Sequence, residues 1–349
     1  MPEQTQLLLG PLVGGLSHDH VNLWARSSGP ATFHAWLGRQ PDFSDAKLAG
    51  RSLPLSDATG CAGVVPLDNL EPETSYFYAL TLNSKPLPKA DGQFRTFPRP
   101  GQPRAFNFAF GSCFRPKGEN SGAAFRALES RRQEDELRFI LLLGDQVYAD
   151  AWEYNGISKV AANLTDYRNV YTHVWSNPHF RALLKNLPAF MTLDDHEVDD
   201  DWRWTDSRRR WASIPWWDQA VRWLKGHPPE EWYLPHHRVR DALQAYWEHQ
   251  GMHAPAMTLP PELNYAGQYK LREQDPGSLA YTFTYGAAAF FVMDTRSMRV
   301  QGRSGKTMLG EGQWQALEDW LRAVKDDFPL KFLVTSCSAL YSMWTDIPR

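Results

Sequence analysis

The sequence contains few cysteines, no long hydrophobic run and no excess of basic residues. Its three cysteines, Cys61, Cys113 and Cys337, are an odd number and too few for a disulfide framework, which indicates a reducing compartment. No segment approaches the roughly 18 consecutive apolar residues of a membrane span. The formal net charge of −3 lacks the positive excess that neutralises a nucleic-acid backbone. We therefore expect no membrane span and no stable nucleic-acid partner.

The first 15 residues do not have the composition of a signal peptide. They carry an acidic residue, Glu3, where a signal peptide needs positive charge, and they contain no twin arginine. We expect a cytoplasmic protein, unless a leader was removed. The length of 349 residues suggests two domains or one large one. The oligomeric state does not follow from the sequence.

Two hydrophobic patterns divide the chain. Residues 14–97 show short alternating runs broken by Gly, Pro, Asn and Asp, which are typical of a small antiparallel β-sandwich. Residues 70–80 resemble the start of a strand in fibronectin type III domains. Three prolines and a glycine within residues 97–103 would not suit a strand or helix interior. We predict an N-terminal β-sandwich domain of fibronectin or immunoglobulin type over residues 1–100 and a second domain over residues 101–349.

The second domain is predicted to be a layered α/β domain. Buried apolar runs alternate with helical stretches, an order that indicates at least partly parallel strands. The predicted strands lie at residues 106–110, 139–143, 189–193, 287–293 and 332–335, and helices are expected at 123–131 and 313–325. In the second helix, apolar residues at i, i+3, i+4 and i+7 form one face that would cover a sheet.

Polar side chains follow four of these predicted strands: Cys113, Asp145, the group Asp194 to Glu197, and Asp294. Ligands bind beside the carboxyl ends of strands in open α/β sheets, so these side chains are expected to converge. Asp145 and Tyr148 offer oxygen ligands for a hard cation, although an Asp that caps a helix above a packed Tyr would look the same. Cys113 is either a thiolate ligand or a small buried hydrophobe, and the latter is expected of Cys61 and Cys337.

Residues 194–201 contain six carboxylates among eight residues. Like charges at this density repel one another unless cations lie among them or the loop is solvated. Because the run begins where a buried strand ends, the metal interpretation is favoured for Asp195 and its neighbours, while Asp199 to Asp201 fit either a second calcium shell or a solvated turn. His196 beside metal-bound carboxylates would suit a general acid.

These residues carry a resemblance to the PhoD-like (alkaline phosphatase D) metallophosphatases. The motifs are GSCF with Cys113, GDQVY with Asp145 and Tyr148, and DDHE over residues 194–197, supported by residues 167–171 and 294–296. The resemblance implies a four-layer α/β domain that binds Fe(III) and Ca(II) and hydrolyses phosphodiesters and phosphomonoesters through attack by a metal-bound hydroxide.

The resemblance also implies a role for each site residue. Cys113 and Tyr148 would ligate iron, Asp145 would bridge the metals and Asp195 would bind metal. His196 would contact the phosphate and the leaving group. From the ligand types alone, zinc or manganese would also be possible.

One part of the family pattern is missing. The family completes its metal site with a late G-D-x-H type motif, whereas this sequence has no histidine after His253. We expect the α/β domain to be C-terminally incomplete. The alternative is a catalytically inactive relative that acts as a binding protein. A glycoside hydrolase with paired carboxylates would fit the tryptophans but would leave Cys113 and Tyr148 unexplained.

The chain has 15 tryptophans, and eight of them lie between Trp202 and Trp247. This segment is either a lid that meets the substrate with its arginines and indoles, or an aromatic core. Arg168 and Arg296 are candidate substrate-binding residues for phosphate, and pairing with the acidic residues at the strand ends is the alternative for both.

Overall fold

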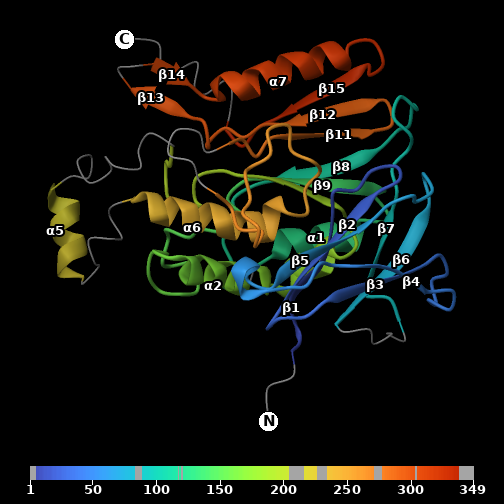
Figure 1. Cartoon of the computed structure of the whole chain (residues 1–349), viewed down its shortest axis with the longest axis horizontal. Helices are drawn as coiled ribbons and strands as arrows, with labels where there is room; N and C mark the ends of the chain where they lie inside the picture. The colour runs from blue at the N-terminus through green and yellow to red at the C-terminus, as the bar shows by residue number, and fades with distance from the viewer. Residues whose placement is uncertain are drawn as a thin grey trace.

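The computed structural model describes residues 5–82, 89–116, 118, 121–203, 216–225, 234–270, 277–302 and 305–337. Figure 1 shows the N-terminal strands at the lower right and the last helix at the top, with the remaining layers between them. Trp204 and the group Arg208 to Trp211 of the tryptophan-rich segment lie outside the described residues.

The N-terminal strands form two antiparallel sheets. One sheet has the order β1 (Leu7–Gly14), β2 (Val21–Ser27), β5 (Ala62–Leu67), and the other has the order β4 (Lys47–Arg51), β3 (Phe33–Gly38), β6 (Ser75–Leu82), β7 (Gly92–Arg95). A short 3-10 turn, η1 (Asp57–Thr59), precedes β5. Alternate side chains such as Leu23, Phe33 and Tyr78 point into one apolar core. The predicted β-sandwich is confirmed.

Two further sheets form the centre of the α/β part. The first has the order β10 (Ala189–Thr192), β9 (Leu137–Leu143), β8 (Asn107–Gly111) with all strands parallel. In the second, β12 (Ala288–Val292) pairs antiparallel with β11 (Tyr281–Tyr285) and parallel with β15 (Leu330–Val334). β13 (Val300–Gly302) pairs antiparallel with β14 (Gly305–Thr307). Mixed pairing of this kind agrees with the predicted α/β class.

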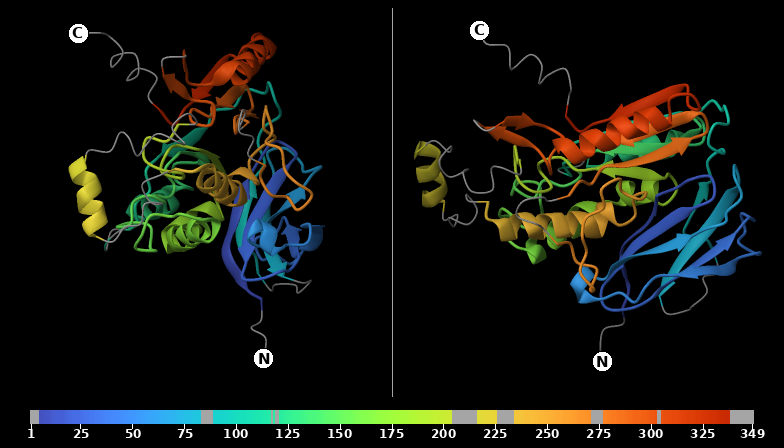
Figure 2. Two further views of the ribbon diagram at one scale, coloured as in Figure 1. Left: turned by 60° about the vertical axis from the view of Figure 1, so that its left-hand side comes forward. Right: turned by 45° about the horizontal axis from the view of Figure 1, so that its top comes forward.

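The two sheets pack face to face and are covered by helices on their outer sides. Phe190 stacks on Phe283 with 3.8 Å between ring centroids, and the Tyr281 hydroxyl donates to the Met191 carbonyl at 2.8 Å. α7 (Gly310–Ala323) covers the second sheet through Trp320. Figures 1 and 2 show the opposite side covered by helices α1 (Ala123–Arg131), α2 (Leu164–Trp175) and α6 (His236–Tyr246). The helix α3 (Pro178–Leu184) packs against α1 through Phe180 and Phe125. The arrangement has four layers: helices, sheet, sheet, helix.

Local sequence sets where these helices begin and end. The side chain of Asn163 accepts a hydrogen bond from the Asp166 amide at the start of α2, and Asn177 caps α3 ahead of Pro178 in the first turn. A five-residue π-helix, η4 (Trp247–Gly251), continues α6. The helix α5 (Trp216–Leu224) lies to one side in Figure 1. None of the helices in the described ranges has both the length and the apolar character that crossing a membrane would require.

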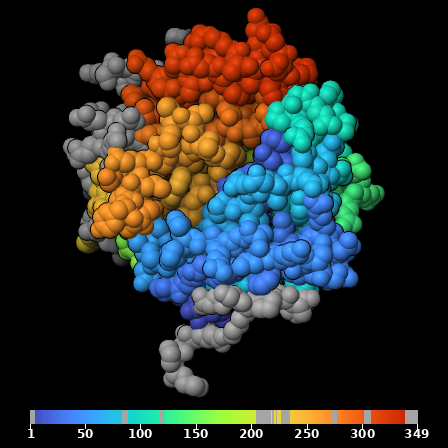
Figure 3. Space-filling view, turned by 45° about the vertical axis from the view of Figure 1, so that its right-hand side comes forward, coloured from blue at the N-terminus to red at the C-terminus, as the bar shows by residue number. Residues whose placement is uncertain are grey.

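The β-sandwich shares its core with the α/β part. Trp24 of β2 packs edge-on against Trp175 of α2 with 5.5 Å between ring centroids, and its indole N–H donates to the Glu248 carbonyl at 2.8 Å. In Figure 3 the blue N-terminal strands lie directly against later, orange segments. The two parts therefore hold each other in place, and a domain boundary at residue 100 stays a prediction.

Candidate metal centre

The carboxyl ends of three parallel strands bring the predicted ligands together around Asp145. Cys113 follows β8, Asp145 follows β9 and His196 lies in the loop after β10. The Cys113 thiol lies 3.4 Å from Asp145 Oδ2, the Tyr148 hydroxyl donates to the same oxygen at 3.2 Å, and the His196 amide donates to Oδ1 at 3.3 Å. Parallel strands end at one edge of a sheet, which is why residues 32 to 51 positions apart meet here.

The backbone at two of these strand ends is in the left-handed region. Cys113 has φ 66° and Asp145 has φ 55°, values that residues with a side chain rarely adopt. Gly144, with φ 83°, lies so close to Asp194 that a Cβ atom there would overlap it. Strained backbone of this kind persists where surrounding contacts enforce it, and it clusters at functional sites.

The donors at this edge fit a metal ion. One ligand atom each from Asp145, Asp195 and His196 lies within 4.8 Å of the others, and Asp195, Asp200 and Asp201 form a second such group. Burial and the charge of Asp194 raise the pKa of Asp145 to about 6. A bound cation would remove this repulsion between carboxylates, and carboxylate and phenolate oxygens with a thiolate suit a hard, highly charged ion.

Tyr148 and His196 lie ring to ring beside this group, with 4.1 Å between their centroids. Burial raises the pKa of Tyr148, so its phenol ionises only when a cation stabilises the oxygen. Burial lowers the pKa of His196, but the hydrogen bond from Nδ1 to the Asp150 carboxylate at 2.9 Å and the charges of Asp150, Asp145 and Asp195 together outweigh it and raise the pKa to about 9. The raised pKa favours the protonated imidazole, the form that a proton donor requires.

Glu197 is the buried anchor of this edge, a role that the sequence pattern did not assign. Its side chain has no exposed surface. Oε2 accepts the amides of Asp145 and Asp194 at 3.1 and 3.2 Å, and Oε1 accepts the Gln146 amide at 2.8 Å and the Gln250 side chain at 3.2 Å. One carboxylate thus joins the loops that follow β9 and β10.

Arg296 connects the second sheet to the site. Its guanidinium contacts Asp194 through Nε, Asp195 through Nη2 at 3.2 Å and the Trp202 carbonyl through Nη1 at 3.2 Å. With all three nitrogens engaged, Arg296 shows the pairing with acidic residues that was the alternative to phosphate binding. Asp294 itself does not join the cluster, since its carboxylate accepts three backbone amides, those of Leu279, Arg296 and Ser297.

Arg168 lies apart from the cluster. It forms an ion pair with Glu248, a fully buried carboxylate on η4, and donates to the Ala58 carbonyl at 3.1 Å. These contacts belong to the junction between α2, η4 and the β-sandwich, and substrate binding by Arg168 stays a prediction. The pattern of residues 167–171 could not show this ion pair, because the partner lies 80 positions away.

A different arginine, Arg115, lies beside the cluster and was missed. Its guanidinium is 4.2 Å from the centre of the Tyr148 ring, and among the described residues it pairs with no carboxylate. The side chain is exposed, two residues after Cys113. Its proximity to Cys113 in the sequence was the available signal.

The cysteines and the acidic loop require two corrections. Cys61 is buried, as expected, but the prediction for Cys337 is wrong: it is half-buried, with Sγ 3.6 Å from Asp194 Oδ1. In the loop, Asp199 pairs with the buried Arg238 at 3.1 Å, so it is not part of a solvated turn.

The described tryptophans of the tryptophan-rich segment differ in their burial. Trp202 is buried in the core that includes α2 and α6, whereas Trp217 and Trp223 on α5 are exposed. Trp202 therefore matches the aromatic-core interpretation, and a lid formed by the remainder stays a prediction.

Comparisons with known proteins show what this chain is similar to. Alkaline phosphatase D of Bacillus subtilis (strain 168) is 26% identical over 324 residues, which cover 81% of this chain and 48% of that protein. The chain thus spans about half the length of this relative. A solved structure described as "Structure of PhoD" shares the fold with a TM-score of 0.67 at 21% identity, covering 94% of this chain and 62% of the other.

The family model described as PhoD-like phosphatase matches residues 108–337, about two thirds of the 349 residues. This region contains Cys113, Asp145, Tyr148 and His196 together with the loops that bring them to one edge. The chain belongs to the PhoD-like phosphatase family.

Proposed function

We propose that this chain is a metal-dependent phosphoesterase that cleaves phosphodiesters, phosphomonoesters or both. The observation that carries the proposal is the convergence of a thiol, a phenol, two carboxylates and an imidazole from three strand ends around Asp145. Membership of the PhoD-like phosphatase family and the relative named alkaline phosphatase D support the reaction class.

Cys113, Asp145, Tyr148 and Asp195 would hold the metal ions, for which Fe(III) and Ca(II) are proposed. The thiol and phenol suit the trivalent ion, and the carboxylates suit both. When bound, such ions activate water and neutralise charge on the phosphoryl oxygens. Arg296 would keep Asp194 and Asp195 in position for this role through its two ion pairs.

His196 is proposed to donate a proton to the leaving oxygen. Asp150 holds Nδ1 at 2.9 Å, which orients the ring and leaves Nε2 as the donor, 4.0 Å from Asp200. Arg115, above Tyr148, is the proposed contact for a phosphoryl oxygen, because its charge is not committed to a carboxylate within the described part of the chain.

The test is hydrolysis of a chromogenic phosphodiester and a chromogenic phosphomonoester with iron and calcium supplied, using Tyr148→Phe as the key variant. This change removes one oxygen and keeps the ring against His196. Tyr281→Phe is the matched control, because that buried phenol also donates one hydrogen bond but lies between the two sheets.

We expect turnover in the wild type and in Tyr281→Phe, and a loss of bound iron and of turnover in Tyr148→Phe. Wild-type protein that binds metal but hydrolyses neither ester would contradict the proposal. That result would favour a noncatalytic relative that binds a partner.

A further inference from the structure

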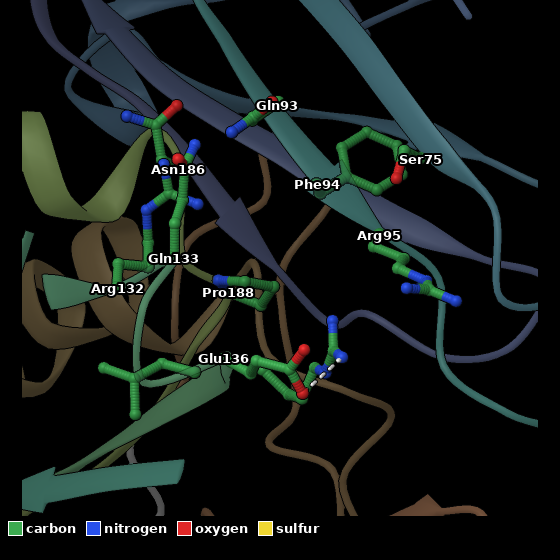
Figure 4. Close-up of a pocket in the computed structure, with 11 residues that line it drawn as sticks. Ser75, Gln93, Phe94, Arg95, Arg132, Gln133, Glu136, Asn186 and Pro188 are labelled. Carbon is green, nitrogen blue, oxygen red and sulfur yellow. Dashed lines mark ion pairs between the residues drawn. The ribbon is translucent and has the colours of Figure 1, made fainter. Parts of the chain in front are cut away.

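A second polar cavity lies on the seam between the β-sandwich and the α/β part. It has a volume of about 250 Å³ and is lined by β7 on one side and by the segment between α1 and β9 on the other. In Figure 4, Arg95 and Phe94 lie on one side of this cavity, with Arg132, Gln133 and Asn186 across from them. The volume is below the roughly 300–1,000 Å³ of drug-sized pockets, which indicates a small ligand.

The lining carries more positive than negative charge. It includes three guanidinium groups, from Arg95, Arg132 and Arg138, and one carboxylate, from Glu136. Arg138 approaches Glu136 only to 3.6 Å, and its Nε atom is buried without a hydrogen-bond partner. Buried N–H groups are rarely left unpaired, so this atom indicates a missing acceptor.

The other arginines also retain free donors. Arg95 donates its Nε to the Glu73 carbonyl at 3.1 Å and pairs with no carboxylate in the described part of the chain. The Glu73 carboxylate is engaged by Arg104 through two hydrogen bonds. Arg132 pairs with Glu129 through Nε alone, at 3.1 Å. Arg95 and Arg132, like Arg138, therefore keep N–H groups that have no protein acceptor among the described residues.

The seam around the cavity is closely packed. The Tyr78 hydroxyl donates to the Lys185 carbonyl at 2.9 Å, and Gly92 lies against the same backbone group so closely that a Cβ atom would overlap it. Both walls are thus fixed before any ligand arrives, which lowers the entropic cost of binding.

We propose that this cavity binds a small phosphate-type oxyanion. Guanidinium groups on different walls suit a tetrahedral dianion, whose oxygens accept hydrogen bonds in several directions. The cavity is separate from the candidate metal centre: Arg138 stands at the start of β9 and Asp145 follows its end, seven residues or roughly 23 Å along the strand. A bound anion would link the β-sandwich to the α/β part.

The test is isothermal titration of inorganic phosphate into the full chain at constant ionic strength. The background variant Asp145→Asn disrupts phosphate binding at the candidate metal centre. Arg138→Gln and Arg95→Gln are then added separately, the second on an exposed side chain so that folding is preserved. Arg131→Gln is the matched control, because Arg131 is exposed, pairs with Asp135 and does not line the cavity.

We expect the Asp145→Asn protein to retain one phosphate site. Its affinity should fall by about tenfold or more in Arg138→Gln and in Arg95→Gln, the effect of losing a charge-assisted hydrogen bond, and stay unchanged in Arg131→Gln. Melting curves confirm that each variant is folded. Unchanged affinity in both cavity variants, or no binding in the Asp145→Asn background, would overturn the proposal.

Discussion

Replacing Glu197 with glutamine exchanges one acceptor oxygen for an NH2 group and keeps the shape of the side chain. The carboxylate has four N–H partners, two on each oxygen, and no exposed surface. In glutamine one oxygen becomes an NH2 group, which faces two of these donors. Gln250 can rotate its amide to accept from that group, since its own oxygen is buried and unpaired. The Gln146 amide then stays unsatisfied.

One unsatisfied buried amide costs about 1–3 kcal/mol of folding stability. The functional cost is separate, because Glu197 aligns the backbone of Asp145 with that of Asp194. Changes to the partners of metal ligands typically reduce metal affinity or activity by about 10- to 100-fold. We therefore expect Glu197→Gln to fold, to melt a few degrees lower and to bind metal more weakly.

The assay combines urea unfolding, a metal titration and kcat/KM for a chromogenic phosphodiester. Glu248→Gln is the matched control: that carboxylate is equally buried, but it accepts from Arg168 and Gln244 and has no hydrogen bond to Asp145 or Asp194. Both variants should lose stability, and only Glu197→Gln should lose metal affinity. Equal metal affinity in the two variants would refute the positioning role of Glu197.

Three further predictions concern single residues. Arg115→Gln should raise KM by about tenfold with little change in kcat, which is the loss expected for one charged contact to phosphate. The control Arg126→Gln, on the exposed side of α1, should leave KM unchanged. Equal KM values in the two variants would show that Arg115 does not contact the substrate. Arg168→Met should cost about 3–5 kcal/mol in denaturant unfolding, since it leaves Glu248 buried and unpaired, and KM should not change. A raised KM in folded Arg168→Met would support Arg168 as a substrate ligand. Burial lowers the pKa of His253 to about 4, below its value of about 6.5 in the unfolded chain, so the unfolded state takes up the proton first as the pH falls. Relative to His253→Gln, the wild type should therefore lose about 3 kcal/mol of unfolding free energy between about pH 6.5 and pH 4, and parallel stability curves of the two proteins would contradict this.

Local hydrophobic patterns in the sequence predicted the expected helices and strands of the second domain well. The expected helix at residues 123–131 coincides with α1, and each expected strand overlaps one of β8, β9, β10, β12 and β15. α7 begins three residues earlier than expected, at Gly310. These successes share a cause: apolar periodicity and breakers act over a few neighbouring residues, so the sequence alone contains them.

The partners of individual side chains were predicted less well. Arg168 pairs with a carboxylate 80 positions away, and Cys337 meets Asp194 across 143 positions. His196 depends on Asp150, which stood outside every motif that we identified. No periodicity encodes such contacts, because they arise only when the ends of separate strands and helices meet in space.

The sequence by itself determined the class of the fold and the chemistry at the strand ends. A thiol, a phenol, carboxylates and an imidazole each follow an apolar run, and parallel strands must deliver them to one edge. Only the tertiary structure decided which of them touch and which charges are already compensated. These contacts depend on burial and on distances of a few ångströms between segments that lie far apart in the chain. The structure shows, for example, that Arg296 and Arg168 form ion pairs, whereas the charge of Arg115 remains available.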